Sequence, residues 1–340
     1  MTVTQVLPWG FLHRDEQCNR TTFLKQYCQS KSTVAKSGQL RHPSTALEAS
    51  PRGIDLIWSR RVGSHEKSGP MTANRITKAA ELFSWSRRVG APIRSPPADL
   101  LPKTLEQAYD IQIATFRLRG MGTAGFKIGL TSVEAQRSAA VAVPIAGRLA
   151  SADILRSPAR IALPPDHLRI VEAEVVFEVG CTPPCDDASL SEADVYHCLR
   201  GAYAGIEICN SRLSGSEDAS LPAIVADNSN ADRLVVGNRL PDWSFEALAD
   251  LSVRLTRRGQ PAVDGTTRRV LGQPLKAVTW LANWLGARGE GLKAGDLIAS
   301  GSCTGMTEVA RDDAVIAVFG GAARVEVEFT EAQMKGGVRA

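Results

Sequence analysis

The clearest hydrophobic pattern in the chain is the alternation across residues 171–180, VEAEVVFEVG. Apolar side chains fill the odd positions, while Glu172, Glu174 and Glu178 lie at even positions. Successive side chains of a β-strand point to opposite faces, so this segment predicts a strand with one face in a core and a row of acids on the other. Residues i and i+2 lie roughly 7 Å apart, close enough for Glu172 and Glu174 to share one cation. A solvated edge strand is the alternative interpretation.

Helical periodicity dominates the segment before this strand. Apolar residues recur at helical spacing over 74–89, and Gly90 follows as a suitable C-cap. A T-x-x-Q capping box begins a second helix over 104–118. The segment 125–132, GFKIGLTS, predicts a short strand followed by a new helix start at Thr131.

Strands prevail in the rest of the chain, although residues 140–170 are rich in proline and suggest loops. We expect strands in 203–212, after a loop within 225–237, and in 251–260, 295–302, 313–321 and 323–329, and helices over 191–200 and from Pro274. Helices followed by many strands indicate an α+β fold rather than a doubly wound parallel sheet. The sequence contains no GxGxxG, P-loop or GxSxG motif.

The N-terminal segment differs from the rest in pattern. Residues 1–70 are rich in Ser and Thr and show no sustained period. We expect a poorly structured extension there, one that need not belong to the native protein if Met71 is the natural start. A single domain is expected over 71–330, with a flexible tail at 331–340.

Composition narrows the class of protein. Residues 1–70 carry ten Lys and Arg against five Asp and Glu, leaving thirty against thirty-one for 71–340, so the body has no basic footprint for nucleic acid. No apolar run is long enough for a membrane helix. Seven cysteines without CxxC or zinc spacing, and the lack of a secretory signal, predict reduced thiols and a cytoplasmic protein.

A third acid strengthens the cation interpretation. Glu207 lies between Ile206 and Ile208 in an apolar segment, where a carboxylate must be protonated, paired or bound to a metal. Three carboxylates suit a hard divalent cation such as Mg²⁺ or Mn²⁺. The spacing of these acids alone favours neither metal binding nor a purely structural role.

Several motifs resemble one family when taken together and in order. They are GFKIGLTS (125–132), VEAEVVFEVG (171–180), GIEICNSR (205–212), ADNS (226–229), LGQPLKAVTWLANWL (271–285) and LKAGDLIASGSCTG (292–305). This set is similar to the 2-keto-4-pentenoate hydratase group of the fumarylacetoacetate hydrolase superfamily, and the similarity extends over roughly 76–329. It implies a mixed β-roll or β-sandwich core with flanking helices, preceded by an N-terminal helical segment.

The resemblance also implies roles for particular residues. Glu172, Glu174 and Glu207 match the family's ligands for Mg²⁺ or Mn²⁺, which chelates a 2-oxo acid substrate. Lys127 matches the family lysine beside the substrate carboxylate or enol oxygen. Ser229, Ser302 and Thr304 match positions that can donate hydrogen bonds to the substrate, although turn formation or capping explains each equally well. The resemblance further implies a small-molecule substrate and a homo-oligomer.

One departure from the family pattern bears on the reaction. Hydratases of this group often carry an acid in a P-D-x-G segment, and here the segment reads PIAG, with Ile145 at the acid's position. An aliphatic side chain cannot move a proton. The resemblance therefore favours a metal-dependent hydratase of 2-hydroxy-2,4-dienoates in aromatic catabolism, yielding 4-hydroxy-2-oxo acids. The alternatives are a decarboxylase of a related 2-oxo-enedioate and a non-catalytic partner subunit of a hydratase–decarboxylase complex.

Overall fold

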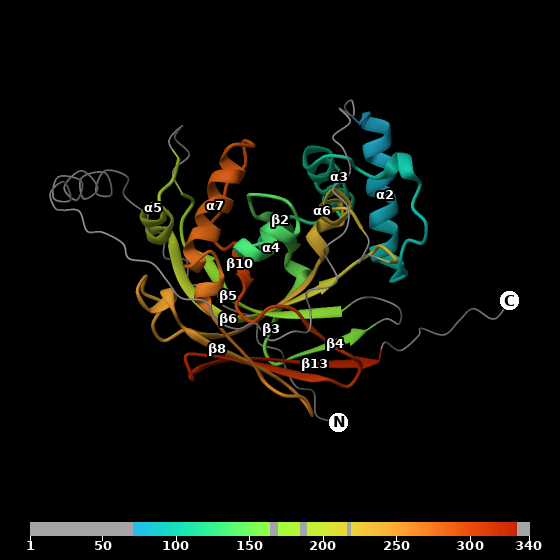
Figure 1. Ribbon diagram of the computed structural model, residues 1–340. Coiled ribbons are helices and arrows are strands. Elements are labelled where there is room, and N and C mark those ends of the chain that lie inside the picture. Colours follow the sequence, from blue (N-terminus) through green and yellow to red (C-terminus); the bar gives the residue numbers. More distant parts are fainter. Residues whose placement is uncertain (1–70, 164–168, 184–188, 216–218, 332–340) are drawn as a thin grey trace, which may run out of the picture. The chain divides into compact units, whose positions relative to one another are not determined.

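A computed structural model of the chain describes residues 71–163, 169–183, 189–215 and 219–331 (Figure 1). The N-terminal segment 1–70 and residues 332–340 lie outside this description, so the expected extension and most of the expected tail stay predictions. Glu331, which the sequence assigned to the tail, instead ends a β-strand.

Two β-sheets form the core of the described residues. The larger has the strand order β2-β1-β10-β5-β6-β7-β3, with β11 paired to β5, and the smaller has the order β4-β13-β12-β8-β9. The strands of the larger sheet are β1 Thr123–Gly129, β2 Ile145–Ala150, β3 Ile154–Arg156, β5 Arg169–Val179, β6 Leu199–Asn210, β7 Ala231–Arg239, β10 Leu297–Ser302 and β11 Thr307–Glu308. Those of the smaller sheet are β4 Ala159–Leu163, β8 Ser252–Arg257, β9 Val263–Thr266, β12 Ala314–Phe319 and β13 Ala323–Glu331. Parallel and antiparallel pairs occur in both sheets, so each sheet is mixed.

The larger sheet curls, and the period of two along its strands separates two apolar clusters. Odd positions of β5, among them Val175 and Phe177, join the core shared with the smaller sheet. Even positions face the inside of the curl, where Val176 clusters with Leu149 of β2 and Leu234 of β7. Because β2 and β7 are far apart in the strand order and yet share this cluster, the sheet wraps around it.

Six α-helices accompany the sheets in the described residues. They are α2 Ala73–Val89, α3 Leu105–Leu118, α4 Val133–Ser138, α5 Glu192–His197, α6 Leu221–Ala226 and α7 Pro274–Gly286. Figure 1 shows α2, α3 and α6 grouped apart from α5 and α7. Apolar residues of α5 and α7 join the core that the larger sheet shares with the smaller one, whereas α2, α3 and α6 form a cluster of their own. None of these described helices is long and apolar enough to cross a membrane.

The chemistry at the helix ends matches most of the sequence signals. Gly90 ends α2 in the left-handed conformation at φ 67°, which costs glycine little. Thr104 accepts a hydrogen bond from the amide of Gln107 at 3.3 Å and so begins α3 as predicted. The predicted start at Thr131 is wrong by one residue, because Ser132 is the N-cap of α4. Thr131 is buried instead, and its carbonyl accepts from a distant backbone amide.

Two further expectations are corrected. Residues 140–170 were expected to be loops, but they contain β2, β3 and β4. Strand β2 is buried at every position, so it shows no alternation, and prolines flank the others closely. The helix expected over 191–200 ends at His197, since Leu199 already belongs to β6.

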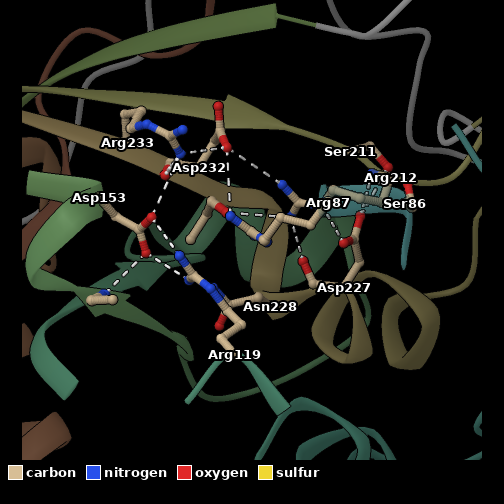
Figure 2. A network of polar contacts seen from close by, with 12 residues as sticks. Ser86, Arg87, Arg119, Asp153, Ser211, Arg212, Asp227, Asn228, Asp232 and Arg233 are labelled. Atoms are coloured by element: carbon tan, nitrogen blue, oxygen red, sulfur yellow. Dashed lines mark hydrogen bonds and ion pairs between the residues drawn. The ribbon is translucent and has the colours of Figure 1, made fainter. Parts of the chain in front are cut away.

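A network of arginine and aspartate side chains ties the N-terminal helices to the larger sheet (Figure 2). Arg119, the C-cap of α3, donates to both oxygens of Asp153 at 2.7 and 2.8 Å. Arg212, which is almost fully buried, donates to Asp227 at 2.5 Å. Arg87 of α2 extends the network, so one polar cluster positions α2 and α3 against the sheet.

Candidate metal centre and active site

Three carboxylates meet on the inner face of the curled sheet. Glu172 of β5 lies directly opposite Glu207 of β6 in the antiparallel register, and Glu174 follows two positions along β5. Directly opposed side chains have Cβ atoms about 5 Å apart, so the register itself gathers the acids. Glu174 and Glu207 are at most 1% exposed, whereas Glu172 is half-buried. The structure thus places the three predicted acids together.

The buried carboxylates are incompletely satisfied. Among the described residues, Oε1 of Glu174 and both oxygens of Glu207 have no hydrogen-bond partner of good geometry. Burial, reinforced by the charges of Glu207 and Glu172, raises the pKa of Glu174 well above its ordinary value. Burial also raises the pKa of Glu207, outweighing the opposing charge of Lys127. Buried acids gathered this closely are costly to ionise unless cations lie beside them.

Lys127 supplies one positive charge from the opposite wall of the curl. It lies on β1, is 4% exposed, and its Nζ is 3.2 Å from Oε1 of Glu207. Burial alone would lower the pKa of Lys127, but the neighbouring acids, Glu207 first among them, outweigh it and raise the pKa. The side chain therefore stays an ammonium, which suits a charge stabiliser and not a general base.

The loop after β10 holds Glu174 in place. The amide of Gly301 donates to Oε2 of Glu174 at 2.8 Å. Gly301 has φ 118°, and a Cβ at this position would lie 2.0 Å from Oγ1 of Thr131. Only glycine combines this conformation with such a close approach. The SGS segment is thus part of the site through its backbone.

Cys209 is a site residue that the sequence analysis missed. Its thiol donates to Oε2 of Glu172 at 3.7 Å, and ligand atoms of Cys209, Glu172 and Glu207 all lie within 4.8 Å of one another. Burial, and then the charge of Glu207, raises the pKa of this thiol. The signal was available: Cys209 follows Glu207 by two positions in a strand, and such residues share a face.

The three predicted hydroxyls differ in how they are used. Ser229 donates to the carbonyl of Ala146 at 2.8 Å and is buried, and Thr304 has its hydroxyl 3.3 Å from the Gly305 carbonyl. Ser302 lies opposite Glu174 in the strand register and accepts from the Gly305 amide at 2.9 Å. Its own O–H is not used in that bond, so Ser302 is the best placed of the three to donate to a substrate.

Ile145 lies beside the lysine. A Cβ built at Gly129 would be 3.1 Å from Cγ1 of Ile145 and 3.6 Å from Nζ of Lys127, so both side chains flank the same point of β1. Ile145 is 5% exposed and packs in the cluster formed with α2, α3 and α6. The side chain at the position where the family resemblance implies an acid is therefore apolar here and lies near the ammonium group.

These residues fit a divalent cation. Three oxygen donors converge beside the Lys127 ammonium, and several of their lone pairs have no hydrogen bond of good geometry among the described residues. Hard cations such as Mg²⁺ and Mn²⁺ prefer carboxylate oxygens, and they keep open positions for water and substrate. Glu172, Glu174 and Glu207 are the side chains that could hold such an ion.

Comparison with known proteins agrees with this fold. The model of the family described as fumarylacetoacetate (FAA) hydrolase, C-terminal, matches residues 132–336. The chain is 31% identical over 270 residues to 2-keto-4-pentenoate hydratase of Paraburkholderia xenovorans, covering 78% of this chain and 99% of the relative. It is also 31% identical over 231 residues to 2-hydroxyhexa-2,4-dienoate hydratase of Comamonas testosteroni, covering 67% and 87%.

A solved structure extends the comparison. The 4-oxalocrotonate decarboxylase of Pseudomonas putida G7, complexed with magnesium and adipate, matches with a TM-score of 0.69 and 26% identity. The match covers 77% of this chain and 100% of that chain. The fold, the acid-lined site and these relatives define a single class: the chain belongs to the fumarylacetoacetate hydrolase family. Within that family it is similar to the 2-keto-4-pentenoate hydratases.

Proposed function

We propose that this protein is a divalent-metal-dependent hydratase of 2-hydroxy-2,4-dienoates that forms 4-hydroxy-2-oxo acids in aromatic catabolism. The observation that carries the proposal is the convergence of Glu172, Glu174 and Glu207, the last two almost fully buried, beside the Lys127 ammonium. Two relatives named as hydratases of this substrate type support it.

Different side chains of the site serve metal binding, charge stabilisation and hydrogen bonding to the substrate. Glu172, Glu174 and Glu207 would hold Mg²⁺ or Mn²⁺, which supplies Lewis-acid stabilisation of negative charge on a 2-oxo acid. Lys127, kept protonated by its acidic neighbours, stabilises the charge that develops on the enol oxygen or binds the substrate carboxylate. Ser302 can donate a hydrogen bond to the substrate from the rim of the site.

A decarboxylase acting on a related 2-oxo-enedioate is the second candidate. Ile145 favours it, because the apolar side chain beside Lys127 cannot deliver a proton, and loss of CO₂ produces an enolate without a water-activating acid. The similar decarboxylase from Pseudomonas putida G7 supports this alternative. The presence of all three glutamates and the lysine argues against a non-catalytic subunit.

A substrate panel separates these candidates. Purified protein is incubated with 2-hydroxydienoates and with 2-oxo-enedioates, with Mg²⁺ and with EDTA. The proposal expects a hydroxy-oxo acid from the dienoates and loss of the reaction in EDTA. Release of CO₂ from the enedioates without hydration would replace the proposal with the decarboxylase, and turnover that is unaffected by EDTA would exclude a metal-dependent reaction of either kind.

We also propose a cytoplasmic location and a homo-oligomeric state. The four cysteines within the described ranges are free thiols, in keeping with a reducing compartment. Exposed Trp85, Val89, Leu118 and Met121 lie on or beside α2 and α3, where a second subunit could cover them. Light scattering on the purified protein tests the oligomer, and a monomeric mass would refute it.

A further inference from the structure

A second polar cavity lies beside the start of β5 and the end of β6, apart from the metal centre. Its volume is about 120 Å³, and the described residues that line it come from the end of α2, from β4, and from β5, β6 and β7. Ile208 is one of them, and it packs in the core between the two sheets. Because Ile208 and Glu207 are consecutive in β6, the cavity lies on the face of the sheet opposite to the acids.

Arginines line one side of this cavity. Among the described residues, Arg87, Arg212 and Arg233 share the lining with a single acid, Asp232. Their guanidinium groups lie 3.5, 3.9 and 3.1 Å from Oδ1 of this aspartate. The wider network labelled in Figure 2 contains four arginines and three aspartates, so positive charge is in excess there. The cavity therefore favours an anion.

Two of these arginines have buried N–H groups directed to no acceptor at good geometry. Nη1 of Arg87 and Nη1 of Arg212 make no hydrogen bond within the described part of the chain, although both form ion pairs with Asp232. Burial, and then the charge of Arg212, lowers the pKa of Arg87 to about 9. Both causes disfavour the cation, so an anion in the cavity would stabilise Arg87 in its protonated form.

Apolar residues line another part of the cavity and restrict the ligand. Ile161 and Leu163 of β4 and Ile208 of β6 are at most 8% exposed. An engineered cavity of about 150 Å³ in another protein holds benzene, so this one suits a ligand of about five or six heavy atoms. Inorganic phosphate would place oxygens against the apolar residues. A short-chain carboxylate instead presents its oxygens to the guanidinium groups and its carbon chain to the apolar residues.

We propose that this cavity binds a short-chain organic carboxylate of about four carbons, held by the guanidinium groups of Arg87, Arg212 and Arg233. The planar guanidinium group matches the two oxygens of a carboxylate, and burial strengthens each charge-assisted hydrogen bond. The cavity and the metal centre lie on opposite faces of β6, so the inference goes beyond the proposed function and does not depend on it.

Butyrate is the probe, because it combines a carboxylate with a short apolar chain. Full-length protein is stripped with EDTA, so that no bound metal ion contributes, and butyrate is titrated at constant ionic strength by ligand-observed NMR. Arg87→Gln should weaken butyrate binding about tenfold or more, because a hydrogen bond to a charged group is lost. Arg88→Gln is the matched control, since Arg88 is the next residue of α2 and is exposed outside the cavity lining.

Two further variants complete the test. Arg233→Gln should weaken butyrate binding as well, and it serves in case loss of the bond from Arg87 to the Ala231 carbonyl disturbs folding. Lys127→Gln should bind butyrate like wild type, because Lys127 lies beside the acids on the other face of the sheet. Melting temperatures show whether each variant is folded.

Several results would overturn the proposal. They are no butyrate binding by wild type, equal affinities in wild type and the folded Arg87 and Arg233 variants, and loss of binding in Lys127→Gln alone, which would place the carboxylate in the proposed active site. Tighter binding of inorganic phosphate than of butyrate would overturn the assigned ligand class. Failure of the proposed function is recognised separately, because the substrate panel and Mn²⁺ binding do not involve this cavity.

Discussion

At the scale of single residues, Glu174 is the acid whose burial and hydrogen bonding most directly test the proposed metal centre. It is 1% exposed, one oxygen accepts from Gly301, and the other has no partner among the described residues. Replacement by glutamine keeps the shape and removes one of three anionic donors. We expect Glu174→Gln to abolish activity and to weaken Mn²⁺ binding by at least about tenfold.

Calorimetry with Mn²⁺ on folded protein measures this effect. Glu178→Gln is the matched control, because Glu178 lies on the same face of β5 but accepts from Tyr203 at 2.7 Å and pairs with Arg200. The control should bind Mn²⁺ like wild type. Unchanged binding in Glu174→Gln would remove Glu174 from the ligand set.

The side chain at position 145 determines whether a group able to transfer a proton lies beside Lys127, and isoleucine cannot transfer one. Ile145→Asp would place a carboxylate beside Lys127, where the ammonium offsets part of the cost of burial. Because a positioned acid or base contributes about 10²–10⁴-fold, we expect at least a tenfold rise in hydration of a 2-hydroxypentadienoate.

Ile145→Asn controls for shape and polarity without a titrating group, and melting temperatures show whether either variant is merely unstable. An equal response of the two variants would mean that proton transfer is not the cause. A stable Ile145→Asp with unchanged hydration would show that another group moves the proton.

The sequence predicted the acids of the site better than its other parts. Glu172, Glu174 and Glu207 follow from alternation and from a charge inside an apolar strand, both of which are local signals. Cys209 carries no charge, so the charge pattern that singles out the three acids does not mark its position two residues after Glu207. The roles of Gly301 and Thr131 depend on a contact between distant segments, which no local pattern encodes.

At the scale of elements, the loop that follows β10 is the weakest support of the site. A side chain at Gly301 meets both an unfavourable φ of 118° and the Thr131 side chain at 2.0 Å. We expect Gly301→Ala to displace the amide that binds Glu174 and to lower Mn²⁺ affinity about tenfold or more, as loss of a supporting hydrogen bond does at other metal sites.

Gly295→Ala is a control that distinguishes the effect of backbone strain from the effect of displacing the Gly301 amide. Gly295 also has a positive φ, 92°, but a Cβ there meets no atom within 4 Å. Both variants should lose some stability, measured by urea unfolding, whereas only Gly301→Ala should lose Mn²⁺ affinity. Equal affinities in the two variants would show that the loop does not position Glu174.

Elements with a clean period were predicted well, and those without one were not. Helices α2, α3 and α7 and strands β5, β12 and β13 each show one apolar face, so their positions could be read from sequence. Strand β2 is buried throughout and was read as loop, and α6 spans only six residues beside a turn. That turn, η4 Asn228–Asn230, has three consecutive residues with positive φ, a conformation that asparagine tolerates and that hydrogen bonds to β2 hold in place.

At the scale of the molecule, the arginine–aspartate network of Figure 2 links stability to pH. Burial alone would raise the pKa of Asp153, but hydrogen bonds from Arg119 and the Ala150 amide outweigh it and lower the pKa. A depressed carboxyl pKa stabilises the fold above the unfolded pKa of about 3.9, and the contribution is lost as pH falls through the folded pKa.

We therefore expect Asp153→Asn to lower the free energy of unfolding at pH 7 by about 3 kcal/mol, as for other broken buried pairs. The difference from wild type should hold down to about pH 5 and shrink below it. Urea unfolding across this range measures it, with Asp264→Asn as an exposed control whose ion pair with Arg254 contributes little. A difference independent of pH would mean that the charge of Asp153 is not what stabilises.

A chain beginning at Met71 tests the domain boundary. The capped helix α2 begins two residues later, and every motif of the site lies beyond it. We expect this shortened chain to fold and to retain full activity. An insoluble or inactive product, compared with active full-length protein prepared in parallel, would assign a structural role to residues 1–70.

The direct pairing of Glu172 with Glu207 has a consequence for how the chain reaches its native state. Slipping β6 by two residues in the direction that pairs Glu172 with Gly205 would leave the apolar face intact, whereas the native register sets the two acids against each other. An ion that binds both carboxylates therefore stabilises the native register relative to this slipped one. On the proposed metal centre, the cation would thus help to fix the alignment of the two strands as well as to serve catalysis.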